Sequence, residues 1–173
     1  IVNGIMYWDT LRQFYEIKKG IVKTKKVGDI ESIAKSKKLT FGKRSKEDKF
    51  TQYDIIILDT LGELGKMYSV CDVAFIGGSF NKTGGHNPLE ATIYSKPAVS
   101  GPSIKNFRDI YAILQREKAA YIVKDEVDMG RILKSLLLES GAYNQATEGC
   151  EKCIQDQQGA LEFVASKLKE ILK

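Results

Sequence analysis

Two consecutive stretches decide the fold: residues 53–65 read YDIIILDTLGELG, and residues 72–90 read DVAFIGGSFNKTGGHNPLE. Each begins with a short apolar run, over Tyr53–Asp59 and Val73–Ile76, and each then reaches glycines. An apolar run of this length that ends at a turn indicates a strand buried on both faces. Because a helical pattern follows each run, the two stretches predict successive strand–helix units of a parallel sheet.

The rest of the chain continues this alternation. Asp125 is expected to cap a helix that runs to about Glu139. Further strands are expected over 39–41, 97–100 and 120–123, and closing helices over about 143–156 and 159–172. The sequence therefore predicts an α/β fold, in which helices cover both faces of a parallel sheet.

Length and composition bound the class of protein. The chain has 173 residues, enough for one ordinary domain, and 43% hydrophobic with 28% charged residues is typical of a globular protein. The run Ile55–Leu58 is far shorter than the roughly 20 apolar residues of a membrane-spanning helix. Three cysteines exclude a dense disulfide scaffold and fit a reducing compartment.

The positive charge is concentrated at one end. Residues 1–49 contain 13 Lys and Arg against 6 Asp and Glu. Such a stretch is either a solvated surface or a region attracted to anionic lipid head groups or phosphates. Nucleic acid is not predicted as a partner, because the lysines are scattered and no recognition motif accompanies them.

The connection after Ile76 is the candidate ligand loop. Paired glycines at Gly84 and Gly85 let backbone N–H groups approach an anion, and the helix start that follows adds partial positive charge. The alternative is a tight loop that needs glycines for their positive φ angles. Asn87 is expected to cap the following helix, with Pro88 at its first position.

Three side chains have both a structural and a functional interpretation. Glu90 can complete a capping box with Asn87, or its carboxylate can accept two hydrogen bonds from a ribose diol. Glu63 has the same alternatives relative to a Thr60 N-cap, and its loop faces the same sheet edge, so the two loops could share one ligand. His86 is a structural hydrogen-bonding group or a phosphate contact. Cys150 and Cys153 form a C-x-x-C without further ligands, so neither a metal nor a redox function is predicted.

These segments resemble the 3-deoxy-D-manno-octulosonic acid (Kdo) transferases in order and spacing. The resemblance covers roughly residues 27–172 and is carried by DTLGELG at 59–65, DVAFIGGS at 72–79, GGHNPLE at 84–90 and QGALE at 158–162. It implies the Rossmann-like C-terminal half of a GT-B glycosyltransferase, which binds CMP-Kdo and uses no cofactor and no metal. It also implies the residues that contact CMP: Leu61, Gly62, Glu63, Asn87, Pro88, Leu89 and Glu90, with Glu90 as the ribose ligand. Gly84, Gly85 and His86 are the expected phosphate contacts.

The resemblance leaves part of such an enzyme outside this chain. The catalytic glutamate and the acceptor site for the lipid A precursor belong to an N-terminal domain, so no catalytic base is assigned here. No first strand of the donor domain is expected before Asp29. We therefore divide the chain into a basic N-terminal segment, 1–26, and a nucleotide-sugar-binding domain, 27–173. Missing edge strands predict a homodimer, or a requirement for the absent domain.

The resemblance also implies a place and a reaction. Kdo would pass from CMP-Kdo to the lipid A precursor in lipopolysaccharide biosynthesis, at the cytoplasmic face of the bacterial inner membrane. Two alternatives stay open at this point. Another GT-B enzyme would use a UDP- or GDP-sugar at the same sheet edge, and a non-catalytic nucleotide-binding fragment would bind without turnover.

Overall fold

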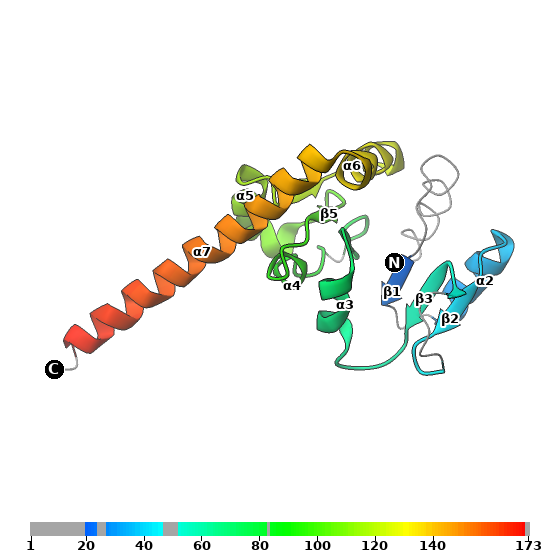
Figure 1. Ribbon diagram of the computed structural model, residues 1–173, viewed down its shortest axis with the longest axis horizontal. Coiled ribbons are helices and arrows are strands. Elements are labelled where there is room, and N and C mark those ends of the chain that lie inside the picture. The colour runs from blue at the N-terminus through cyan, green and yellow to red at the C-terminus, as the bar shows by residue number, and fades with distance from the viewer. Residues whose placement is uncertain (1–19, 24–26, 47–51, 83, 172–173) are drawn as a thin grey trace.

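The computed structural model describes residues 20–23, 27–46, 52–82 and 84–171, and Figure 1 shows its elements. All of its strand pairs are parallel, which confirms the predicted α/β class, and the strands form two sheets of three. Sheet A has the order β1-β3-β2 and sheet B the order β4-β5-β6. The strands are β1 (Gly20–Lys23), β2 (Phe41–Lys43), β3 (Ile55–Leu58), β4 (Ala74–Ile76), β5 (Ala98–Ser100) and β6 (Ala120–Ile122).

Sheet A is built around the apolar run of β3. All four β3 residues are buried, and the strand lies between β1 and β2, with Ile55 opposite both Gly20 and Phe41. Helix α2 (Val27–Ser36) covers this sheet by packing Ile30 and Ala34 into the same cluster as Ile55. The structure corrects one expectation, because β1 is a strand that lies before Asp29 and pairs with β3 along its length.

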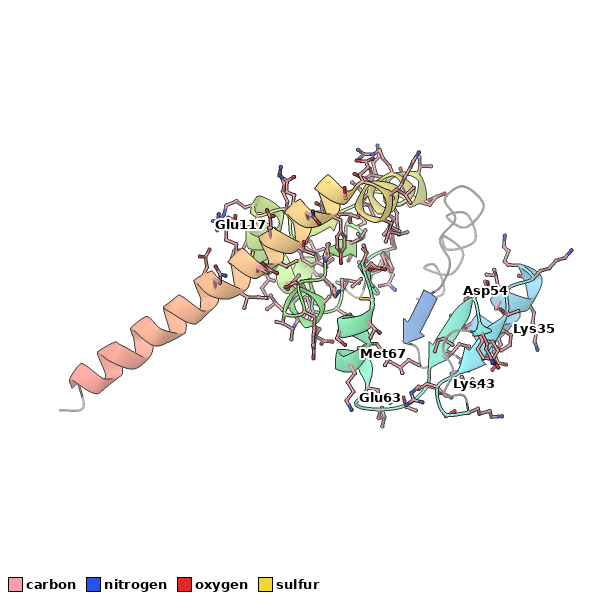
Figure 2. The ribbon with its side chains drawn as sticks, in the orientation of Figure 1. Lys35, Lys43, Asp54, Glu63, Met67 and Glu117 are labelled. Atoms are coloured by element: carbon pink, nitrogen blue, oxygen red, sulfur yellow. The ribbon has the colours of Figure 1, made fainter. Side chains whose placement is uncertain are left out.

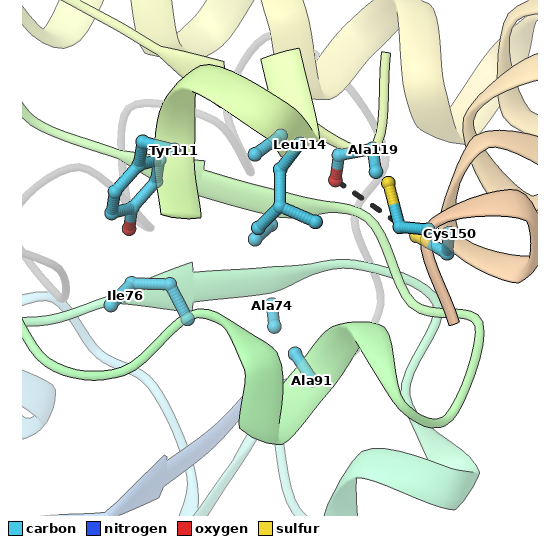
Figure 3. Close-up of a cluster of buried hydrophobic side chains, with 10 residues drawn as sticks. Ala74, Ile76, Ala91, Tyr111, Leu114, Ala119 and Cys150 are labelled. Carbon is cyan, nitrogen blue, oxygen red and sulfur yellow. Dashed lines mark hydrogen bonds between the residues drawn. The ribbon is translucent and has the colours of Figure 1, made fainter. Parts of the chain in front are cut away.

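Sheet B carries a separate core on each of its faces. Along β5, Ala98 packs into one buried cluster and the next residue, Val99, into the other, as the alternation of a strand requires. The first cluster joins α4 (Leu89–Thr92), α5 (Arg108–Arg116) and α7 (Ser140–Ile171), and Figure 3 shows Ala74, Tyr111 and Leu114 within it. The second joins α6 (Glu126–Leu138) and α7. Helices on both faces are therefore confirmed for this sheet.

Several helix boundaries differ from the sequence expectations. Helix α7 is continuous from Ser140 to Ile171, so the two predicted closing helices are one, and its C-terminal half extends beyond the sheets in Figure 1. A glycine inside a helix costs only about 1 kcal/mol, which is too little to end it at Gly159. Asp125 caps α6 as predicted, because its carboxylate accepts the Asp128 N–H at 2.8 Å.

Helix α3 (Leu64–Val70) begins later than expected. Thr60 is not its N-cap, because Gly62 has φ +78°, in the left-handed region, and this turn separates Thr60 from the helix. A single 3₁₀ turn, η2 (Lys105–Phe107), precedes α5. The connection from β3 to α3 and the connection from β5 to α5 both follow the carboxyl ends of strands, where the candidate site is expected.

Candidate functional site

The loops that follow β4 and β5 are fastened together by Ser79. This side chain is fully buried. Its Oγ donates to the Ile76 carbonyl at 2.6 Å and accepts the Gly101 N–H at 2.8 Å. The Ser79 carbonyl in turn accepts the Ser103 N–H at 2.8 Å. Because parallel strands place their carboxyl ends at one edge, this serine fixes two neighbouring loops where a ligand would meet the sheet.

Glycines make the close contact between these loops possible. Gly84 and Gly85 have φ angles of +89° and +76°, and a Cβ on Gly85 would lie 3.1 Å from the Ser103 carbonyl oxygen. In the loop after β5, a Cβ on Gly101 would lie 2.6 Å from the Ser79 carbonyl oxygen. The loop therefore does require glycine for its conformation, which is one of the two interpretations that the sequence allows.

Two backbone amides of this loop donate within it. The Gly85 N–H donates to the Gly78 carbonyl at 3.1 Å, and the His86 N–H donates to the Gly77 carbonyl at 3.2 Å. Helix α4 has only four residues, so the helix dipole expected to favour an anion here is smaller than the sequence suggested. A phosphate at this loop would therefore depend on side-chain donors more than on these two amides.

The predicted site residues around α4 differ in exposure. His86 and Glu90 are exposed, Asn87 and Leu89 are half-buried, and Pro88 is buried. Asn87 is not the expected N-cap and Pro88 is not the first helical residue, because α4 begins at Leu89 with Pro88 as its N-cap. The Asn87 Oδ1 instead accepts the Leu89 N–H at 3.0 Å, one residue before the cap position.

Glu90 lies beside the neighbouring helix α3. Burial of the phenol, followed by the nearby Glu90 carboxylate, raises the pKa of Tyr68 to about 12. The Tyr68 ring stacks with that of Tyr94 at a centroid distance of 6.4 Å, and a Cβ on Gly65 would lie 3.3 Å from the Tyr94 hydroxyl. Helices α3 and α4 therefore pack against each other.

The connection from β3 to α3 is organised around the Glu63 carboxylate, which Figure 2 shows next to the start of α3. The Thr60 hydroxyl donates to this carboxylate, and Arg44 Nη2 lies 3.2 Å from its Oε1. The Thr60 hydrogen bond and then the charge of Arg44 lower the pKa of Glu63, against its partial desolvation. Leu61 and Gly62 are exposed, the Leu61 side chain almost fully. The partners of Glu63 thus follow strands of sheet A, whereas those of the glycine loop follow strands of sheet B. The structure therefore corrects the expectation that the two loops face one sheet edge.

The C-x-x-C motif is part of the core. Cys150 is fully buried and Cys153 is nearly so, and the Cys150 Sγ lies 3.9 Å from the Ala119 carbonyl oxygen, as Figure 3 shows. Burial, followed by the neighbouring Cys153, raises the pKa of the Cys150 thiol from 9.0 to about 12. Within the described ranges, no three His, Cys, Asp or Glu side chains gather in a way that could hold a metal ion.

Thiol labelling checks this interpretation. At pH 8 we expect the half-buried Cys71 to react first, although burial raises the pKa of its thiol and slows it, and the other two thiols to react no faster than the chain unfolds. The fast phase should vanish in Cys71→Ser, the matched control. Since the folded chain holds the Cys150 proton to about pH 12 and an unfolded thiol loses it near 9.0, stability should fall as the pH rises through that window. Rapid labelling of all three thiols would contradict a buried pair.

Two residues of the site were missed by sequence reasoning. Ser79 directly follows the glycine pair that ends β4, and Arg44 directly follows β2, so both stand at strand ends where ligand loops begin. That position is the signal that could have drawn attention to them. Their partners could not be found in this way, because Gly101 and Glu63 lie about twenty residues further along the chain.

Sequence comparisons confirm the resemblance to the Kdo transferases. No family model matches the chain. A "3-deoxy-D-manno-octulosonic acid transferase" of Haemophilus influenzae is 30% identical over 83% of this chain and 34% of its own length. Proteins of the same name from Rickettsia prowazekii and Aquifex aeolicus are 37% and 33% identical, over 69% and 73% of this chain. The match covers only 24% and 37% of their lengths, so this chain spans about a quarter to a third of these relatives.

A solved structure has the same fold. The crystal structure of the C-terminal CMP-Kdo binding domain of WaaA from Acinetobacter baumannii superposes with a TM-score of 0.72. The match covers 87% of this chain and 99% of that one, at 21% sequence identity. The likeness supports the assignment of the parallel α/β elements to one half of a GT-B architecture, and at this identity it concerns the fold alone.

Proposed function

We propose that this chain, a relative of the 3-deoxy-D-manno-octulosonic acid transferases, is the donor-binding part of an enzyme that moves Kdo from CMP-Kdo to a lipid A precursor. The observation that carries the proposal is the glycine loop after β4, tied through Ser79 to the loop after β5. This loop lies at the carboxyl edge of a parallel sheet, where ligands of such folds bind. The string GGHNPLE at 84–90 begins within it.

The proposed contacts divide between the nucleoside and the phosphate. Leu61, Gly62 and Glu63, together with Asn87–Glu90, hold the CMP moiety. Glu90 accepts two hydrogen bonds from the ribose hydroxyls, a role supported by its exposed carboxylate. Gly84, Gly85 and His86 border the phosphate. As CMP leaves, charge grows on that phosphate, and donors fixed in advance around it lower the barrier.

The remaining functions are assigned outside these residues. The acceptor site and the catalytic base belong to a separate N-terminal domain, and we expect the complete enzyme at the cytoplasmic face of the inner membrane. None of the described helices combines the length and the apolar stretch that crossing a bilayer requires. The basic residues 1–49 would favour an anionic membrane surface. We keep the homodimer as a proposal for the isolated chain.

Calorimetric titration with nucleotides tests the donor assignment. We expect CMP to bind in preference to UMP and GMP, and Glu90→Gln to weaken CMP binding about tenfold to a hundredfold through loss of charge-assisted hydrogen bonds. Deoxy-CMP lacks the 2′-hydroxyl, so it should bind more weakly than CMP. Its affinity should fall little further in Glu90→Gln. Glu148→Gln, which alters an exposed carboxylate on α7, is the matched control and should bind as the unaltered chain does.

Each other outcome has a defined meaning. Preference for UMP or GMP would replace CMP-Kdo by a different nucleotide sugar. Absence of nucleotide binding by the folded chain would contradict the proposed function. Equal binding by Glu90→Gln and the unaltered chain would remove Glu90 from the ribose site while leaving the donor assignment intact.

A further inference from the structure

Two of the amides that the glycine loop could offer to an anion are already paired. The Gly85 and His86 amides already donate to the carbonyls of Gly78 and Gly77. Helix α4, with four residues, contributes little field. A phosphate bound at this loop would leave much of its charge uncompensated unless a cationic side chain reached it. The question is therefore which cation the fold holds against the loop.

Lys105 is the cation that contacts the loop backbone. A Cβ built on Gly84 would lie 2.6 Å from Cγ and 2.9 Å from Cε of Lys105, so the lysine stem runs across the glycine. The next residue supports this placement, because the Asn106 N–H donates to the Gly84 carbonyl at 3.4 Å. Gly84 thus leaves room for the lysine stem as well as adopting a positive φ angle.

The backbone that carries Lys105 is fixed from both sides. Ile104, just before η2, and Phe107, at its end, pack against the core of sheet B. The Phe107 N–H donates to the Ile104 carbonyl at 2.9 Å, and the preceding Ser103 is tied to Ser79. A lysine with a packed stem and an exposed head loses less side-chain entropy when it binds an anion. Lys105 is exposed, which leaves its ammonium accessible.

Two other lysines near this edge are placed less favourably. Lys82 lies in the glycine loop itself, two residues before Gly84, and is exposed. Lys124 follows β6 and lines a shallow groove that also contains Asp125, Asp128 and Arg131. The two carboxylates beside Lys124 oppose the approach of an anion. Lys105 is the better candidate because its stem lies against Gly84.

We propose that Lys105 binds the phosphate of the nucleotide donor through its ammonium group, above Gly84. This inference rests on the proposed function and adds to it a residue that sequence reasoning did not include in the site. The ammonium supplies a charge-assisted hydrogen bond to a phosphate oxygen, and it remains in place as negative charge grows on the departing nucleotide.

Titration of CMP and cytidine into the full chain and Lys105→Gln tests the inference. We expect the variant to bind CMP about tenfold more weakly, as loss of one charge-assisted contact predicts, and to bind cytidine unchanged. Lys105→Arg should retain most of the affinity, and Lys82→Gln, the matched control from the glycine loop, should change it less than twofold. The CMP affinity of the unaltered chain should also fall more steeply with added salt than that of Lys105→Gln.

Four results would overturn the inference. Equal CMP affinity of Lys105→Gln and the unaltered chain would remove Lys105 from the phosphate site while leaving the proposed function standing. Equal losses of affinity for CMP and for cytidine would mean that Lys105 maintains the shape of the loop and does not bind the phosphate. A loss seen with CMP-Kdo but not with CMP would assign it to the sugar carboxylate. If the unaltered, folded chain binds no CMP, the proposed function and this inference fail together.

Discussion

Replacing Gly149 with alanine should lower the free energy of unfolding by about 3 kcal/mol or more, the upper end of the cost of overpacking a core. Gly149 is buried where α7 crosses the end of α5, and a Cβ there would clash directly with the Glu117 carbonyl oxygen. In an ordinary helix interior the same change stabilises by up to about 1 kcal/mol. The contact with backbone therefore reverses the usual sign.

The backbone that Gly149 meets cannot move aside cheaply. The Glu117 N–H donates to the Ile113 carbonyl, and two residues later the Ala119 N–H donates to Leu114 at 2.7 Å while the Ala119 carbonyl accepts from β5. Side chains tie the same point to α7, because Lys152 Nζ lies 2.6 Å from the Glu117 carboxylate. A shift of α7 would instead break the Lys152 contact and open the core at Cys150.

Urea unfolding followed by circular dichroism measures the effect. The matched control is Gly141→Ala in the first turn of the same helix, where a Cβ would meet nothing within 4 Å. That variant should be as stable as the unaltered chain or more stable by a few tenths of a kcal/mol. If both variants behave alike, α7 does not approach Glu117 as closely as the structure has it.

Replacing Ser79 with alanine should cost about 2 kcal/mol of stability and also loosen the candidate site. The change leaves the Gly101 N–H without its acceptor in a buried position, and such a group costs about 1–3 kcal/mol. It also removes the bond to the Ile76 carbonyl that holds the start of the loop. Since Ser79 joins the loops that carry Gly84 and Lys105, we expect CMP affinity to fall as well.

Ser69→Ala is the appropriate control for that experiment. Ser69 is exposed on α3, and its hydroxyl donates to the Lys66 carbonyl of the same helix at 2.7 Å. Its replacement should change the free energy of unfolding by less than about 0.5 kcal/mol. A Ser79→Ala chain that matches this control in stability would mean that water satisfies the Gly101 amide.

Local sequence predicted the parts of the fold that depend on neighbouring residues. The apolar runs found β3, β4, β5 and β6 to within one or two residues, because a buried strand must be apolar along its whole length. The Asp125 cap was also predicted, since a cap depends on residues within one turn. Strand β1 was not, because its four residues stand among lysines and gain their place only by pairing with β3.

The sequence predicted where the candidate site lies, but not the contacts made within it. The position of Gly84–Glu90 at a strand end follows from the order of elements, and so does its proximity to the next loop. The destinations of the Gly85 and His86 amides depend on how the loop folds back onto its own strand, which spacing does not encode. Likewise, the contact of Lys105 with Gly84 joins residues about twenty positions apart.

The division of strands between two sheets has a consequence for synthesis on the ribosome. The last strand of sheet A ends at Leu58, before the first strand of sheet B begins at Ala74, and each sheet pairs only strands from its own stretch of sequence. Short separations between paired strands keep the entropy of loop closure low. The core of sheet A can therefore assemble before the strands of sheet B are complete, and the nascent chain then adds sheet B to an existing base.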